Sequence, residues 1–214
     1  MAVVGYYDMT QGQGGAYQAD EVTGSGHTAV SATDLTPITL SSIDTLYVTN
    51  PDNAGFGAGY TSALADIDAA VQGGMNLMIF DRAVTDAQTI LPGGSAITVV
   101  RDFANDHTVD VAAGAPSWFT DGPNGTIDDS TFDGGTSSSH GYVTLASLPP
   151  GAIPLLTNGN PDQVVAFVYP HGDGMVFYTT IPLDYYSSAE NTSITPAEVT
   201  TLFGNVQYGF ELLS

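Results

Sequence analysis

The sequence predicts an α/β protein with a doubly wound, mostly parallel sheet, on the basis of two observations. Continuous apolar runs of strand length recur through the first half, at residues 2–8, 43–52 and 75–82. Stretches with helical periodicity separate them, and strands that are apolar on both faces are typical of parallel sheets covered by helices on both sides. The repeated order of strand, helix and strand therefore favours a doubly wound sheet. The length of 214 residues suits a single domain spanning 1–214.

The elements of the first half follow in order, and one helix among them has the clearest pattern. Leu64, Ile67 and Val71 share one face of this helix, and Gly73-Gly74 supplies its C-terminal stop. The expected elements are strand 2–8, helix 15–22, strand 27–35, strand 43–52, helix 60–74, strand 75–82, helix 84–91 and strand 97–103.

The second half opens with a loop-rich acidic insertion at residues 105–141 and then returns to regular structure. A β-hairpin is expected here, because HGDG between Pro170 and Met175 has the composition of a tight turn. Pro196 suits the first turn of a final helix. The expected elements are strands 141–148, 163–170 and 174–186 and helix 195–213.

The charge balance excludes several classes of function. The chain has 23 acidic residues and two basic ones, which gives a formal charge of −21. Nucleic acids and anionic membranes need lysine or arginine to neutralise phosphates, so no nucleic-acid partner is expected. No apolar run approaches the ~20 residues of a membrane span, so no direct membrane insertion is expected. The absence of cysteine excludes disulfides, thiolate nucleophiles and cysteine-ligated zinc.

The acidic insertion is rich in oxygen ligands and in glycine. Hard cations such as Ca²⁺ take six to eight oxygens from carboxylates, amides and backbone carbonyls. We therefore predict that the insertion is a calcium-binding elaboration that holds several Ca²⁺ ions, and a solvated acidic loop is the alternative. The predicted ligands are Asp121, Asn124, Asp128, Asp129 and Asp133.

A second set of polar residues falls where the predicted strands end. In an open α/β sheet, ligands bind beyond the carboxyl ends of the strands. Four separate segments place polar groups at this edge, which favours a binding site. The alternative is that strand ends are polar simply because they reach the surface. We predict metal ligation by Asp8, Asp52, Asp81 and Asp184. We predict ligand binding by Asn50, Arg82, Ser139, His140, Tyr185 and Tyr186.

Two stretches resemble the class I glutamine amidotransferase-like fold, in particular its trehalose-utilisation-type domains. They are MNLMIFDR, which ends at Arg82, and GDGMVFYTTIPLDYY, in which Gly172, Gly174, Val176 and Tyr178 match the hairpin pattern. The resemblance implies a flavodoxin- or amidotransferase-like core. It places the family's cysteine near Asp81 or Arg82, where this chain has none, and the expected Gly-His is replaced by residues 181–184.

FDGGTSSSHGYV, SLPPGA and YTTIPLDYY together look like the peptide-binding module of giant RTX-type calcium-dependent bacterial adhesins. This resemblance implies a monomeric module of a larger extracellular, cell-surface protein. It also implies that the module binds several Ca²⁺ ions and captures a peptide or protein C-terminus on a host or neighbouring cell, without enzymatic turnover.

Two alternatives to this calcium-dependent binding module stay open. One is a metal-dependent hydrolase on the same fold that uses Asp81, His140 or Asp184. No residue is placed by the sequence as an activated nucleophile with a positioned base, so the sequence favours a protein that is not an enzyme. The other alternative is a calcium-rigidified spacer that binds nothing but its ions.

Overall fold

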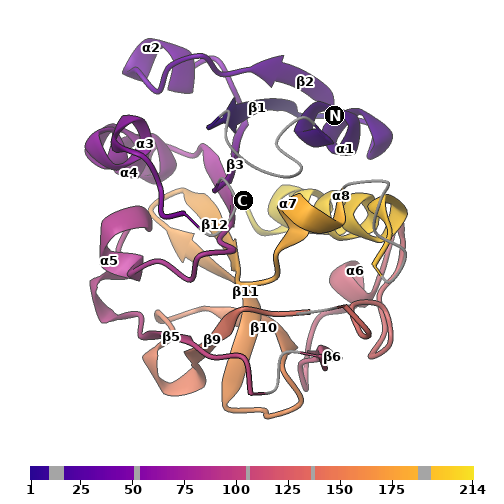
Figure 1. The fold of residues 1–214 in the computed structure, drawn as a ribbon. Helices are drawn as coiled ribbons and strands as arrows, with labels where there is room; N and C mark the ends of the chain where they lie inside the picture. The colour runs from indigo at the N-terminus through magenta and orange to yellow at the C-terminus, as the bar shows by residue number, and fades with distance from the viewer. Residues whose placement is uncertain (10–16, 51–53, 105–106, 136–137, 188–193) are drawn as a thin grey trace.

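A computed structural model describes residues 1–9, 17–50, 54–104, 107–135, 138–187 and 194–214 (Figure 1). Its strands are β1 (Val3–Asp8), β2 (Thr28–Ser31), β3 (Thr45–Thr49), β4 (Asn76–Phe80), β5 (Val99–Arg101), β6 (Asp110–Val111), β7 (Asp121–Gly122), β8 (Gly125–Thr126), β9 (Gly141–Thr144), β10 (Ile153–Thr157), β11 (Gln163–His171) and β12 (Gly174–Thr179). Its α-helices are α1 (Gln18–Gly24), α2 (Pro37–Leu40), α3 (Ala58–Ser62), α4 (Leu64–Gln72), α5 (Ala87–Ile90), α6 (Ser117–Thr120), α7 (Leu183–Tyr186) and α8 (Pro196–Leu213).

The main sheet has the strand order β2-β1-β3-β4-β12-β11-β10-β6. The pairs from β2 through β12 are all parallel, whereas β12 pairs with β11, and β11 with β10, in antiparallel fashion. Strand β12 therefore joins a parallel half to an antiparallel half. The prediction of a doubly wound, mostly parallel sheet with a β-hairpin in the second half is confirmed.

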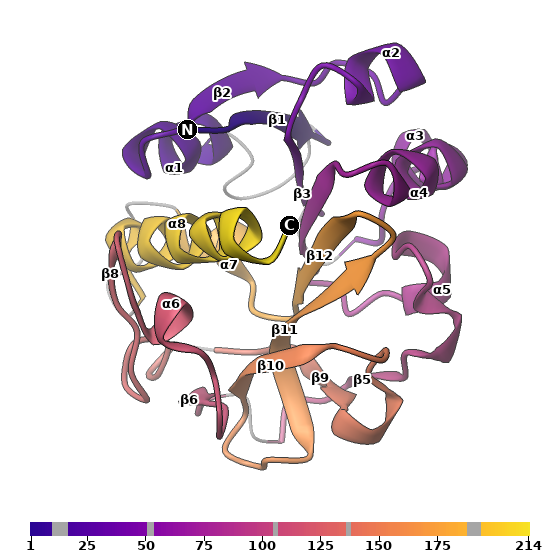
Figure 2. The same cartoon turned by 180° about the vertical axis from the view of Figure 1, so that it is seen from behind.

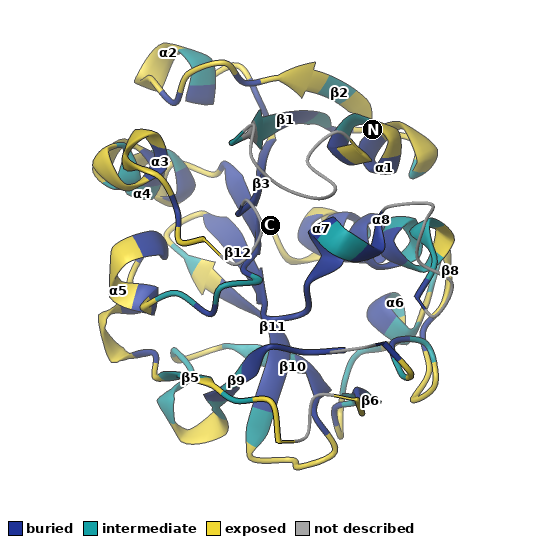
Figure 3. Ribbon diagram, in the orientation of Figure 1, coloured by how far each residue is buried: buried dark blue, intermediate teal, exposed yellow. Residues whose placement is uncertain are grey.

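Two hydrophobic cores cover the two faces of this sheet. One lies under α1 and α8 and includes Val22, Phe203 and Phe210, and the other lies under α2 to α5 and includes Leu40 and Ile67. Figures 1 and 2 show these two helical layers on opposite sides of the strands. Strands β3 and β4 are buried along their whole length (Figure 3). This accounts for the apolar and aromatic residues in the interior of both strands, at 46–48 and 77–80.

Helix α8 is the longest described helix and begins where the sequence places it. Thr195 and Glu198 form a capping box, and Pro196 occupies the first turn, where its missing N–H costs no hydrogen bond. Two glycines allow close packing along α8. A Cβ at Gly209 would lie 2.4 Å from the Trp118 ring, and one at Gly204 would lie 2.3 Å from Asn124. Helix α8 thus binds the acidic insertion to the core.

Five expected elements differ from the structure. The strand expected at 141–148 is β9, which ends at Thr144 because Leu145–Ser147 form a 3-10 turn. The helix expected at 60–74 is two helices, α3 and α4, because the chain turns at Ala63. The strand expected at 97–103 is the short β5, which pairs with β9 antiparallel because β12 already occupies the free edge of β4. The strand expected at 174–186 ends at Thr179, since Pro182 has no N–H to donate and α7 follows. The insertion at 105–141 contains β6, α6, β7 and β8.

The sequence did not predict α2 or β10. In the described part of the chain, no helix combines the length and the apolar character needed to cross a bilayer.

Candidate functional site

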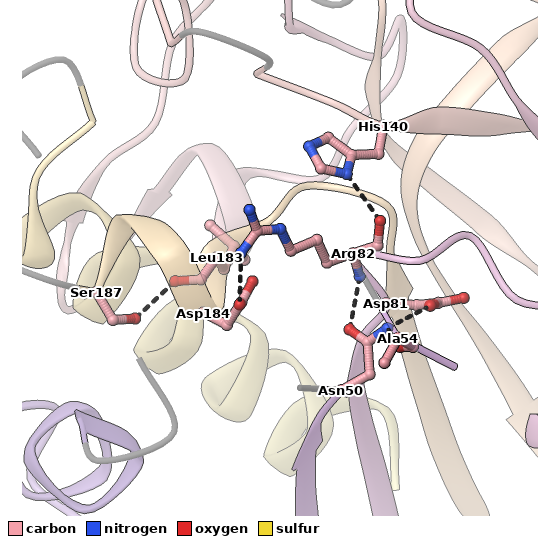
Figure 4. A network of polar contacts seen from close by, with 8 residues as sticks. All are labelled: Asn50, Ala54, Asp81, Arg82, His140, Leu183, Asp184 and Ser187. Carbon is pink, nitrogen blue, oxygen red and sulfur yellow. Dashed lines mark hydrogen bonds and ion pairs between the residues drawn. The ribbon is translucent and has the colours of Figure 1, made fainter. Parts of the chain in front are cut away.

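Six residues at the carboxyl edge of the parallel strands are linked through the backbone and side chain of Arg82, and we call them the rim cluster. They come from the ends of β3 and β4, from the residue before β9, and from α7. The rim cluster consists of Asn50, Asp81, Arg82, His140, Asp184 and Tyr185, and Figure 4 shows all of these except Tyr185.

Asp81 directly follows β4, is fully buried and is surrounded by donors. Its carboxylate accepts hydrogen bonds from the Thr85 backbone N–H at 2.6 Å, Thr85 Oγ1 at 3.0 Å, Tyr178 OH at 2.8 Å and Asn50 Nδ2 at 3.2 Å. Burial raises the pKa of Asp81 to about 6, and the hydrogen bonds from Thr85 and Tyr178 limit the rise. Asp81 therefore fixes the turn after β4.

Arg82 carries the only guanidinium of the rim cluster. Its backbone N–H donates to Asn50 Oδ1 at 2.8 Å, and its side chain donates to Asp184 Oδ2 at 3.2 Å (Figure 4). The guanidinium carbon lies 5.4 Å from the centre of the Tyr185 ring. The side chain of Arg82 is 12 % exposed and that of Asp184 only 3 %, so this ion pair is largely removed from water.

His140 is held in one orientation by the backbone next to it. Its Nδ1 lies 2.8 Å from the carbonyl oxygen of Arg82, which can only accept a hydrogen bond (Figure 4). The neutral ring therefore carries its proton on Nδ1 and its lone pair on Nε2. The ring of Phe103 packs against it, with 5.0 Å between ring centres.

The turn between β4 and α5 contains an unusual backbone conformation. Val84 has φ = 54°, and no other described non-glycine residue has a positive φ. A β-branched residue in this region is strained, and such strain persists only where surrounding interactions hold it. The Asp81 carbonyl accepts a hydrogen bond from the Val84 N–H, and the carboxylate of Asp81 binds Thr85. The turn is therefore a constrained elbow beside Arg82.

A second buried carboxyl group, Glu21 on α1, lies close to the rim cluster. It accepts hydrogen bonds from Tyr47 OH and from Ser187 Oγ, which follows α7. Burial raises the pKa of Glu21 to about 7, with a further contribution from the negative charge of Asp184. Glu21 is not among the site residues predicted from the sequence. The spacing of the buried residues Gln18, Glu21 and Val22 on one helical face is the signal that could have identified it.

The other predicted site residues at this edge fall in different environments. Ser139 and Tyr186 are buried, at 1 % exposure each, and the Tyr186 ring packs edge-on against Tyr185. Asp8 is the last residue of β1, and Asp52 lies outside the described residues.

The predicted ligands in the acidic insertion make their hydrogen bonds with residues outside the rim cluster. Asp128 accepts from Ser130 and Thr131 in its own turn, and Asp121 accepts from Thr126. The Asn124 backbone donates to Asn205 on α8. Asp129 and Asp133 accept from the backbone N–H groups of residues 111 and 109.

The described residues contain no cluster of acidic and histidine side chains that could hold a metal ion. Among them, no three histidine, aspartate or glutamate side chains lie close enough together to hold an ion. A cavity of about 520 Å³ also opens at the carboxyl edge of the sheet, beside the ends of β1 and β2. Its lining includes Tyr7, Met9 and Tyr60. The prediction of bound calcium stays a prediction.

Comparison with known proteins identifies the fold. No protein-family model matches the sequence, and no curated protein matches it. The cytoplasmic protein STM1381 of Salmonella typhimurium is a similar solved structure, with a TM-score of 0.67, 12 % identity and coverage of 98 % of this chain and 99 % of that one. PurLQS of Thermotoga maritima has a TM-score of 0.52, 11 % identity and coverage of 97 % and 99 %. A putative GMP synthase protein of Thermoplasma acidophilum has a TM-score of 0.51, 13 % identity and coverage of 100 % and 99 %.

At these identities the comparisons show the fold, and this chain has an amidotransferase-like α/β fold. They correct one expectation. The inference that the protein is not an enzyme is contradicted, because the fold is shared with chains of amidotransferase-type enzymes along nearly the whole of both chains. No comparison supports the resemblance to an RTX adhesin module.

Proposed function

We propose that the rim cluster binds a small substrate that bears a carboxylate, and that it hydrolyses an ester or amide bond in that substrate with His140 as the general base. The observation that carries this proposal is the hydrogen bond from His140 Nδ1 to the Arg82 carbonyl, at 2.8 Å. A base whose second nitrogen is fixed in this way presents a defined lone pair for proton transfer. Amide cleavage is also the chemistry that an amidotransferase-like fold suggests.

The remaining members of the rim cluster supply binding. Arg82 has the planar fork of donors that suits a carboxylate, and Tyr185 stacks on it and limits its movement. The ion pair with Asp184 holds the guanidinium at the edge of the sheet. Because the chain has a formal charge of −21, an anionic substrate needs such a local cation to bind.

The reaction needs no nucleophilic side chain. Nε2 of His140 takes a proton from a water molecule, and the resulting hydroxide attacks the carbonyl carbon of the substrate. The tetrahedral intermediate then expels the alkoxide or amine, which receives the proton back from the imidazolium. The absence of cysteine is compatible with this route.

Replacing His140 with asparagine tests the proposal. The amide of asparagine can still donate to the Arg82 carbonyl but cannot act as a base, so kcat/KM should fall by about 10²–10⁴-fold while the fold is kept. The substrates are L-glutamine and the mono-p-nitrophenyl esters of succinate and glutarate. His171→Asn is the matched control, because His171 binds Asp68 at a distant site and its loss should leave the rate unchanged.

A second substitution separates substrate binding from catalysis. Arg82→Gln should weaken the binding of carboxylate esters and leave the hydrolysis of the corresponding uncharged methyl diesters nearly unchanged. The proposal fails if the wild-type protein hydrolyses none of these compounds between pH 5 and 9, or if His140→Asn retains full activity.

A second proposal concerns Ca²⁺ and the acidic insertion. The residues whose N–H groups bind Asp129 and Asp133 flank Asp110 on β6. Burial raises the pKa of Asp110, and the charges of Asp129 and Asp133 add to the rise. No three of these carboxylates lie close enough together to hold an ion by themselves. Neighbouring negative charges nevertheless favour a bound cation, and backbone oxygens and water would complete its coordination. We extend this proposal to an extracellular location and to a peptide or protein C-terminus as the partner, which are supported only by the acidic composition.

Calcium should then stabilise the protein. At a Ca²⁺ concentration about 100-fold above Kd, binding adds ~2.7 kcal/mol to the free energy of unfolding, and Tm should rise by about 5 °C relative to EDTA. The measurement is thermal unfolding by circular dichroism in each buffer. Asp110→Asn should reduce the shift, whereas Asp162→Asn, which removes an exposed charge elsewhere, should not. Equal melting temperatures with Ca²⁺ and with EDTA would exclude the ion.

A further inference from the structure

A large cavity opens at the edge of the sheet opposite the rim cluster. It has a volume of about 790 Å³ and is lined by residues before β1, β3 and β4, by α2 and α4, and by the last turns of α8. This volume lies within the ~300–1,000 Å³ typical of small-molecule sites. The cavity contains none of the residues of the rim cluster.

Two buried amide side chains on the cavity wall each have a donor nitrogen without a protein acceptor. Gln207 on α8 is 1 % exposed, and its Oε1 accepts a hydrogen bond from Thr45 Oγ1 at 3.0 Å. Asn76 at the start of β4 is 8 % exposed, and its Oδ1 accepts from the Met175 N–H at 3.0 Å. Within the described ranges, Gln207 Nε2 and Asn76 Nδ2 donate to no protein atom.

Neither nitrogen is among the buried side-chain atoms that lack a partner, so both reach the solvent that fills the cavity and can donate to a bound molecule. Both amides line the same cavity. Their two nitrogens therefore offer a pair of donors to acceptor oxygens in a bound molecule.

The charges around the cavity are negative. Asp44, Asp66 and Glu211 contribute carboxylates to its lining, and no lysine, arginine or histidine is among its described lining residues. The one positive group among them is the amino group of Met1, 3.7 Å from Glu211. A ligand that carries an ammonium group would complement these carboxylates.

Apolar side chains complete the lining. Leu40 and Ile43 form one part of the wall, and Met75 lies next to Asn76. They provide a surface for the carbon skeleton of a ligand, whereas the amides and carboxylates fix its polar groups.

From this arrangement we infer that the cavity is a second ligand site, selective for a small hydroxylated amine of the amino sugar class. The hydroxyl oxygens accept hydrogen bonds from Gln207 and Asn76, and the carboxylates of Asp66, Glu211 and Asp44 around the cavity attract the ammonium group. The inference does not depend on hydrolysis at the rim cluster.

Isothermal titration calorimetry with glucosamine tests this inference. Glucose has the same ring without the positive charge, and N-acetylglucosamine has the nitrogen in neutral form, so both should bind at least ~10-fold more weakly. Glu211→Gln and Asp66→Asn alter exposed side chains, and each should weaken glucosamine binding several-fold with little effect on folding. Gln207→Met should weaken glucosamine and glucose alike, since it removes the donor to the hydroxyl groups.

A matched control distinguishes specific binding in the cavity from the nonspecific attraction of a cation to an acidic protein. Asp162→Asn removes one exposed negative charge away from the cavity and should leave the affinity unchanged. The inference is overturned if glucosamine shows no binding heat at ~20 mM, well above the millimolar affinity of a weak site. It is also overturned if glucose binds as tightly, or if Asp162→Asn weakens binding as much as Glu211→Gln.

Discussion

Replacing Glu21 with glutamine should stabilise the protein at pH 8 and leave its stability near pH 4 almost unchanged. Glu21 is buried, and its pKa is raised to about 7 from the ordinary value of 4.5. At pH 8 the folded protein therefore holds a buried negative charge. Glutamine can still accept from Tyr47 OH and donate to Ser187 Oγ, so both hydrogen-bonding partners are kept without that charge.

The pH dependence follows from the direction of the pKa shift. Because the folded state binds the proton of Glu21 more tightly than the unfolded state does, this group contributes stability that is fully present below pH 4.5. The contribution is lost as the pH rises through about 7. A shift of this size corresponds to on the order of 3 kcal/mol in the free energy of unfolding.

Urea unfolding of the wild type and of Glu21→Gln, measured at intervals between pH 4 and pH 8, checks this prediction. Asp20→Asn is the matched control, because Asp20 lies next to Glu21 on α1, is exposed and carries the same charge. It reports the effect of removing one negative charge from the protein, which also grows with pH. If the profiles of Glu21→Gln and of the wild type run parallel, Glu21 does not titrate in this range.

Replacing Asp81 with alanine should destabilise the protein more than the loss of any exposed carboxylate. Asp81 receives hydrogen bonds from Thr85, Tyr178 and Asn50, and its removal leaves these donors without their acceptor. Leaving such buried groups unpaired costs ~3–5 kcal/mol of the free energy of unfolding. Val84 would also lose part of the support for its strained backbone.

Chemical denaturation at pH 7.5 measures this cost. Asp81→Asn keeps one acceptor oxygen and should cost clearly less than Asp81→Ala. Asp86→Ala, five residues along the chain, removes an exposed side chain that caps α5 by accepting from the Gln88 N–H. It should cost ~1 kcal/mol. A similar loss for Asp81→Ala and Asp86→Ala would mean that the elbow after β4 does not depend on Asp81.

The parallel half of the sheet could be predicted from the sequence because strands that are buried on both faces consist mainly of apolar residues. Strands β3 and β4 are buried at every position, and their sequences are apolar or aromatic except at their ends, where Thr45, Thr49 and Asn76 lie. The antiparallel half was predicted less well, since β5 and β6 are two or three residues long and partly exposed. Segments of that length carry no periodicity, so only their pairing partners define them.

The rim cluster could be predicted only in part. The rule that ligands bind beyond the carboxyl ends of parallel strands selected Asn50, Asp81, Arg82 and Asp184, and the structure brings these together. The role of each residue could not be predicted, because it depends on how deeply the side chain is buried in the folded protein. Asp81 is a buried acceptor, whereas Arg82 reaches the edge. Glu21 was missed because its contacts with Tyr47 and Ser187 join segments far apart in the sequence.

Strand β12 pairs with both β4 and β11, and these two pairings also determine the order in which this protein can fold. Its pairing with β11 closes a short loop, and a hairpin of this kind forms within microseconds. Its pairing with β4 joins residues almost half the chain length apart, and that closure carries a large entropic cost. During synthesis, the edge of β4 that pairs with β12 must therefore stay unpaired until β12 has left the ribosome. A chain truncated before β12 should aggregate rather than fold.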